Sequence, residues 1–125
     1  MILSRRKVLA ASAAALFLTR PSKASTEDTL VACRASLARL FPNSLGQARA
    51  LGRICGADTQ GAEALLDQIC QETLDRRRLV GAPLEALRAA IGERIRVDYA
   101  HGRTRRIDGW VLSQTEIRIF AILAG

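Results

Sequence analysis

Residues 107–123 read IDGWVLSQTEIRIFAIL and contain three local signals in succession. The apolar residues before Ser113 predict a strand over about 104–112. Ser113 and Glu116 have the spacing of a capping box, in which each side chain bonds the backbone amide of the other residue. The apolar residues that follow predict a final helix that ends near Gly125 and packs on the strand. This stretch therefore predicts a strand that leads directly into a C-terminal helix.

The residues just before this stretch change from a helical to an alternating pattern. Residues 95–99 read IRVDY, so apolar and charged side chains would point to opposite sides of a strand. His101 and Gly102 would supply the turn between this strand and the next. We therefore expect a β-hairpin made of 95–99 and 104–112.

Amphipathic segments precede the hairpin, each with apolar residues at three- and four-residue spacing. They predict helices over 26–40, over 45–55, from 58 or 59 to about 78, and over 84–91. The fold class that follows is α+β and mostly α, with four to five short helices and one C-terminal β-hairpin followed by a final helix.

Two features of these helices leave alternatives open. The arginine run 76–78 closes the third predicted helix, where cations complement the helix dipole, and an anion-binding patch is the alternative interpretation. Gly46 and Gly52 either weaken the second helix or mark where another helix approaches closely.

The composition fits one globular domain with a single core. The chain has 125 residues, of which 49% are hydrophobic and 25% charged. Its net charge is +7, but five of the nineteen basic residues and no acidic residue precede position 25. The remaining 25–125 therefore carry fourteen basic and twelve acidic residues, and this near balance gives no reason to expect nucleic-acid binding.

The first 24 residues have the three parts of a signal peptide. A basic start is followed by eleven apolar or small residues from Val8, and then by small side chains at Ser22 and Ala24. A membrane span needs roughly 20 apolar residues, so we expect no stable span. We predict cleavage between Ala24 and Ser25, a signal over 1–24, and a single mature domain over 25–125.

The segment 4–9, SRRKVL, resembles the twin-arginine signal of bacterial Tat substrates. The resemblance rests on Arg5 and Arg6, while Val8 stands where such signals usually have a bulky aromatic residue. It implies recognition by the Tat translocase and a periplasmic location. An ordinary secretory signal is the alternative.

The three cysteines belong to no recognised metal or haem motif. Cys33, Cys55 and Cys70 are 22 and 15 residues apart, and no CxxC pair is present, so we expect neither a metal nor a bound cofactor. Residues 30–33, LVAC, match a lipoprotein cleavage box by letter but lie a dozen residues beyond the apolar segment. We therefore expect buried free thiols on helices, with Cys33 and Cys70 as the pair to test for a disulfide.

Residues 108–118 also resemble the C-terminal signature D-G-W-x-L-S-x-T-E-x-R of small Tat-exported bacterial proteins. This resemblance implies no particular reaction. A bulge permitted by Gly109, the large indole of Trp110 and the capping box explain much of the motif structurally. The functional hypothesis is an interaction surface, because Trp, Tyr and Arg anchor many interfaces. Its members would be Tyr99, Trp110, Glu116 and Arg118.

No catalytic constellation is recognisable in the sequence. His101 is the single histidine, and the chain has neither a nucleophile elbow nor a glycine-rich phosphate loop. His101, Asp108 and Ser113 would form a triad by composition alone, but capping already explains Ser113. We therefore expect a protein that is not an enzyme.

Two functions remain. The leader is similar to those of small subunits of periplasmic flavin dehydrogenases, which implies a non-catalytic accessory or small subunit of a larger, cofactor-containing periplasmic oxidoreductase that it carries through the Tat system. The alternative is a stand-alone periplasmic protein that binds a small ligand or responds to stress. An exposed patch around Tyr99 and Trp110 would favour the subunit, and a closed apolar cavity would favour the stand-alone protein.

Overall fold

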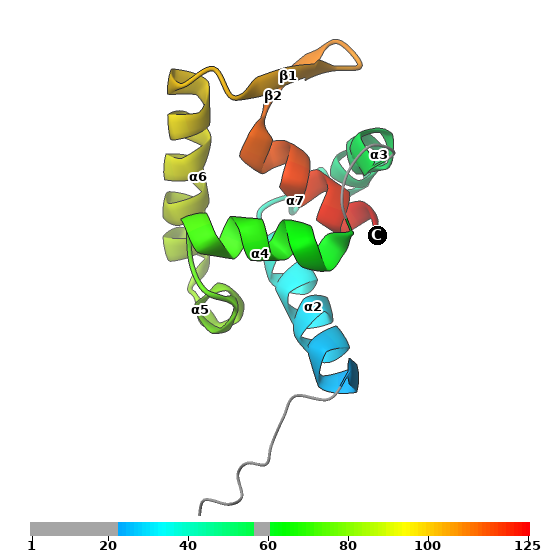
Figure 1. Ribbon diagram of the computed structural model, residues 1–125, viewed down its shortest axis with the longest axis vertical. Coiled ribbons are helices and arrows are strands. Elements are labelled where there is room, and N and C mark those ends of the chain that lie inside the picture. The colour runs from blue at the N-terminus through cyan, green and yellow to red at the C-terminus, as the bar shows by residue number, and fades with distance from the viewer. Residues whose placement is uncertain (1–22, 57–60) are drawn as a thin grey trace, which may run out of the picture.

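The computed structural model describes residues 23–56 and 61–125 (Figure 1). Within these ranges the chain is mostly helical, with one small antiparallel sheet before the last helix, which confirms the predicted fold class. The elements in chain order are α2 (Lys23–Ala38), α3 (Leu45–Gly56), α4 (Ala62–Glu72), α5 (Arg76–Gly81), α6 (Leu84–Ala100), β1 (Thr104–Ile107), β2 (Trp110–Ser113) and α7 (Gln114–Ala124).

The signal-peptide predictions lie almost entirely outside the described residues. Arg5 and Arg6 precede the first described residue. Helix α2 begins at Lys23, three residues before the predicted start, so the proposed cleavage site between Ala24 and Ser25 falls in its first turn.

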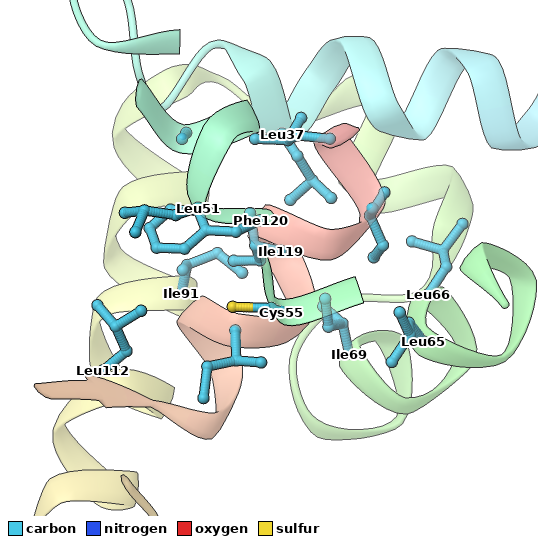
Figure 2. Close-up of a cluster of buried hydrophobic side chains, with 14 of the residues drawn as sticks. Leu37, Leu51, Cys55, Leu65, Leu66, Ile69, Ile91, Leu112, Ile119 and Phe120 are labelled. Carbon is cyan, nitrogen blue, oxygen red and sulfur yellow. The ribbon is translucent and has the colours of Figure 1, made fainter. Parts of the chain in front are cut away.

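Helix α7 lies at the centre of the molecule and contacts α2, α3, α4, α6 and β2 (Figure 1). It is apolar around most of its circumference, as expected for a helix covered on several sides. Ile119 and Phe120 lie among apolar side chains from the surrounding helices and β2, including Leu37, Leu51 and Leu112 (Figure 2). The buried residues of α7 are Thr115, Ile117, Ile119, Phe120, Ile122 and Leu123.

Gly52 allows α3 to approach α7 closely. A Cβ atom at Gly52 would lie 1.9 Å from the carbonyl oxygen of Phe120, a distance that no side chain can occupy. A Cβ atom at Gly46 would meet nothing within 4 Å. The helix-approach interpretation is therefore confirmed for Gly52 and not for Gly46.

The third predicted helix is two helices in the structure. Helix α4 ends at Glu72, and Asp75 begins α5 by accepting a hydrogen bond from the Arg78 amide at 2.8 Å. The prediction that one helix continues to Arg78 was wrong, because Asp75 competes for the backbone as an N-cap. The arginine run therefore lies in α5 and does not end α4. The predicted start of the third helix at 58 or 59 lies outside the described residues.

The predicted strand over 95–99 was also wrong, because α6 continues through these residues to Ala100. The alternating pattern placed Asp98 on the exposed face and Tyr99 on the buried face. In the structure Asp98 is buried, with 1% of its surface exposed, whereas Tyr99 is 46% exposed. Ile91 and Asp98 are seven residues apart and both buried, which is the spacing of one helix face. A search for apolar residues at helical spacing does not detect this face, because one of its buried positions is a carboxylate.

The hairpin turns at Asp108 and Gly109, not at His101 and Gly102. Both turn residues have positive φ, 51° and 84°, as a two-residue type I′ turn requires. Strand β1 pairs with β2 in the register Ile107 to Trp110 and Thr104 to Ser113. His101 instead ends α6, and its amide bonds the Val97 carbonyl at 3.0 Å.

The predicted capping box is present at the start of α7. Ser113 Oγ accepts from the Glu116 amide at 3.0 Å, and Glu116 Oε1 accepts from the Ser113 amide at 2.8 Å. The Gln114 amide bonds the Arg103 carbonyl at 3.0 Å, and the Thr115 amide bonds Asp98 Oδ2 at 2.8 Å. The first turn of α7 thus has its backbone donors satisfied by groups from α6, the α6–β1 connection and β2.

Candidate functional site

Tyr99 and Glu116 meet at the outer edge of β2. The Tyr99 hydroxyl lies 2.9 Å from the Val111 carbonyl oxygen and 3.2 Å from Glu116 Oε1, so its single proton is shared between two acceptors. Partial burial and the Glu116 carboxylate together raise the pKa of Tyr99 above its usual value of 10.0. The phenol therefore remains protonated and fixes β2 to the end of α6, while nearly half of the ring surface stays in solvent.

Trp110 lies on the opposite side of β2, above an apolar groove. Because successive strand residues point to opposite faces, Trp110 and Leu112 share the face that meets α3, and Val111 points away from it. Trp110 is 53% exposed and Val111 46% exposed. The groove has a volume of about 190 Å³ and opens to solvent. Its lining comes from α3, the segment before it, β2 and α7: Phe41, Ser44, Gln47, Ala48, Leu51, Trp110, Leu112, Glu116 and Phe120.

Glu116 connects the two sides of this region. Its carboxylate accepts from the backbone at the start of α7 and from Tyr99, and its side chain also lines the groove below Trp110. The structure therefore brings together three of the four predicted surface residues: Tyr99, Trp110 and Glu116. We call the exposed side chains of Tyr99, Trp110 and Val111, which lie on both faces of β2 and at its outer edge, the hairpin patch.

Arg118 is not part of the hairpin patch. Its guanidinium donates to Glu72 on α4 at 3.0 Å, and only 14% of its side chain is exposed. Arg94 of α6 approaches the same Glu72 oxygen at 3.2 Å. Arg118 lies between Glu116 and Phe120, which line the groove, but points to another side of α7, where it joins α7 to α4 within the protein.

A buried carboxylate holds the hairpin and the start of α7 in place. Asp98 Oδ2 accepts from the amide and hydroxyl of Thr115 at 2.8 and 2.6 Å, and Oδ1 accepts from Arg103 at 3.2 Å. Burial alone would raise the pKa of Asp98, but these hydrogen bonds and the nearby Arg94 lower it below its usual value of 3.8. Asp98 is therefore ionised, and both of its carboxylate oxygens accept hydrogen bonds within the protein, so neither is directed toward solvent.

The three residues of the nominal triad have separate local roles. A ring nitrogen of His101 lies 3.0 Å from the Val97 carbonyl oxygen at the end of α6. Asp108 occupies the hairpin turn, and Ser113 is buried as the cap of α7. Among the described residues, no group of three or more His, Cys, Asp or Glu side chains is placed to bind a metal ion.

All three cysteines carry free thiols, and none lies in the groove. Cys33 is fully buried and donates weakly to the Arg76 carbonyl at 3.8 Å. Burial, with a smaller contribution from Cys33, raises the pKa of Cys70 to about 11. Thiols with such raised pKa values are poor nucleophiles at neutral pH.

A second hollow lies between α2 and α5, next to the arginine run. Arg76 and Arg77 line this hollow of about 700 Å³ together with Asp28. Arg76 is already bound to Glu63 and Asp67 of α4 at 2.6 and 2.7 Å. Its charge is thus satisfied within the protein, which argues against Arg76 as an anion ligand, although the run begins α5 and does not close α4 as predicted.

The sequence did not predict two groups of residues in this region. Arg105 and Arg106 of β1 are exposed beside the hairpin patch, and two adjacent arginines in a short strand were the available signal. Phe41 and Leu51 line the groove only because α3 packs against α7, and no local pattern reports that contact.

Searches of protein families, curated proteins and solved structures found no match for this chain. No helix within the described ranges combines the length and the apolar character that crossing a membrane demands.

Proposed function

We propose that the protein is a non-catalytic accessory or small subunit that binds a larger, cofactor-containing oxidoreductase in the periplasm and carries it through the Tat system. The observation that carries the proposal is Trp110, the single tryptophan, standing 53% exposed over an open apolar groove. Exposed aromatic side chains beside an apolar depression are typical of protein-binding surfaces, and Trp and Tyr dominate binding hot spots.

The shape of the groove favours a protein partner over a small ligand. Small-molecule sites enclose most of their ligand and usually measure roughly 300–1,000 Å³. The groove below Trp110 is smaller, at about 190 Å³, and open on one side. Such a depression fits one anchoring side chain of a partner protein better than a whole metabolite.

The position of the hairpin patch also suits docking. The hairpin projects at one end of the molecule, away from α2 and α5 (Figure 1). The patch rests on a framework fixed by Tyr99 and by the capped start of α7, so little order needs to be gained on binding. The proposal therefore requires no rearrangement of the core.

The test is recovery of the tagged protein from the periplasm of its native host, with mass spectrometry and an absorption spectrum of the proteins that co-elute. A larger, coloured, signal-less protein in fixed ratio is expected with the wild type. Trp110→Ala should reduce its recovery by about tenfold or more, since hot-spot truncations cost roughly 2 kcal/mol or more. Val31→Ala is the matched control, because Val31 is 60% exposed on α2, far from the hairpin.

A colourless monomer recovered alone at native expression would overturn the subunit proposal. The stand-alone alternative, a small-ligand-binding or stress protein, would then be pursued through the small molecules that co-purify. Equal partner recovery with Trp110→Ala and Val31→Ala would instead remove the hairpin patch from the interface.

A further inference from the structure

The hairpin has one closed edge and one open edge. Because Ile107 and Trp110 flank a two-residue turn, they form a hydrogen-bonded pair, and the next pair, Arg106 and Val111, directs its backbone groups outward. On the β2 side, the Tyr99 hydroxyl donates a hydrogen bond to the outward Val111 carbonyl at 2.9 Å. On the β1 side, no described group bonds the outward amide or carbonyl of Arg106. Strand β1 therefore offers an unpaired N–H and C=O to another chain.

The side chains along this open edge are strongly basic. Arg105 and Arg106 point to opposite faces of the hairpin, both are exposed, and neither forms an ion pair with a described carboxylate. Arg103, the third arginine of this segment, differs because Asp98 binds it at 3.2 Å. Two unpaired positive charges at the open edge would repel a second copy of β1, since like charges on paired strands are destabilising. They would attract an acidic strand.

We propose that the open edge of β1 binds an extended acidic segment of the partner, which joins the hairpin as a third strand. This inference rests on the proposed function and adds the chemistry of the partner segment. The segment would pair with the Arg106 amide and carbonyl, and adjacent carboxylates on its two faces would meet Arg105 and Arg106. The hairpin patch, on the β2 side, would lie across β1 from this added strand and contact the body of the partner.

Peptide binding to the purified protein tests the strand directly. The probe is acetyl-Thr-Val-Glu-Glu-Val-Thr-amide, followed by the NMR shift of the Arg106 amide and by Trp110 fluorescence. Replacing both glutamates with glutamine should weaken binding by about tenfold, because charge-assisted hydrogen bonds are lost. Methylating the peptide nitrogens that face β1 should abolish binding, because they could no longer donate to the open edge.

Two protein variants separate charge from strand addition. Arg105→Glu with Arg106→Glu should eliminate binding of the acidic peptide. Arg77→Glu with Arg78→Glu makes the same change in net charge on α5, away from the hairpin (Figure 1), and should leave binding intact. Arg106→Pro removes the outward N–H together with the guanidinium, so its matched control is Arg106→Ala, which removes the guanidinium alone. Arg106→Pro should preserve the hairpin and bind about tenfold more weakly than Arg106→Ala.

Several results would overturn the inference. One is undiminished binding of the methylated peptide, or equal binding to Arg106→Pro and Arg106→Ala, which would mean a charged surface without strand pairing. Another is tighter binding of an oligothymidylate than of the peptide, which would assign the arginines to a nucleic acid. Normal recovery of the native partner with the Arg105→Glu and Arg106→Glu variant would contradict this inference and leave the proposed function standing. Peptide binding without any co-purifying partner would contradict only the proposed function.

Discussion

Asp98 is the residue on which the hairpin region depends most. It is 1% exposed, yet it accepts hydrogen bonds from Thr115 and Arg103 and lies 3.6 Å from Arg94. A buried charge is tolerated only when its partners replace the water it has lost, and here they come from α6, α7 and the α6–β1 connection. Loss of this carboxylate would therefore release three parts of the chain at once.

Asp98→Asn is expected to lower the free energy of unfolding by about 2–4 kcal/mol at neutral pH, because the buried arginine contacts lose their charge partner. Folding lowers the pKa of Asp98 below 3.8, so the unfolded chain binds more protons in acid. The stabilisation is complete above the unfolded pKa and disappears as the pH falls through the folded value. Urea unfolding at pH 7 and again below pH 4 measures this. The free energy of unfolding should fall less between the two pH values in Asp98→Asn than in wild type. Glu93→Gln, which replaces an exposed carboxylate, is the control.

The cysteines give a second test at this scale. Because burial raises the pKa of Cys70 to about 11 and Cys33 is fully buried, native protein should react slowly with iodoacetamide at pH 7 and faster as the pH approaches 11. Denatured protein should react at all three cysteines. Protein exported to the periplasm is the sample for the Cys33–Cys70 disulfide, which would appear as a mass two hydrogens lower and as a single alkylated thiol after denaturation.

Among the elements, the contact between α3 and α7 sets the position of the groove. Gly52→Ala should destabilise the fold by about 2 kcal/mol or more, because its methyl group would overlap the Phe120 carbonyl and push the helices apart. Gly46→Ala on the same helix has open space and should be neutral or stabilising by about 0.5 kcal/mol. Thermal unfolding of the two variants checks the contrast, and equal melting temperatures would contradict the close approach.

The sequence predicted elements well where a local signal was complete, as at the capping box of Ser113 and Glu116. The sequence predicted the wrong element where one residue type is compatible with two local structures. Asp75 can continue a helix surface or cap a new helix, and Asp98 can be a strand's polar face or a helix's buried carboxylate. The choice depends on partners distant in sequence, such as Thr115, and a pattern within one segment contains no information about them.

The candidate site follows the same distinction. Tyr99, Trp110 and Glu116 were predictable because their types suit an interface, and the structure brings them together at β2. Arg118 was grouped with them by proximity in sequence, but helix geometry turns it toward Glu72. The open edge of β1 could not be predicted, because the turn was expected seven residues too early and the pairing of Arg106 changes with it.

At the scale of the whole molecule, the export proposal has its own test. Replacing Arg5 and Arg6 with lysine should stop export and leave the full-length protein in the cytoplasm, because the Tat resemblance rests on that pair. Cell fractionation followed by immunoblotting measures the distribution. Unchanged export of the double variant would indicate the ordinary secretory route instead.

The central place of α7 also determines the order in which this protein can fold during its synthesis. The ribosome makes α2 to α6 first, yet the apolar faces of α2, α3, α4 and α6 are covered by a helix that emerges after all of them. Domains fold as units once their parts are available, so the nascent chain must hold its core open until residues 114–124 have left the ribosome. Chaperones that shield apolar segments of nascent chains would therefore meet α2 to α6 with their apolar faces uncovered, before the core closes.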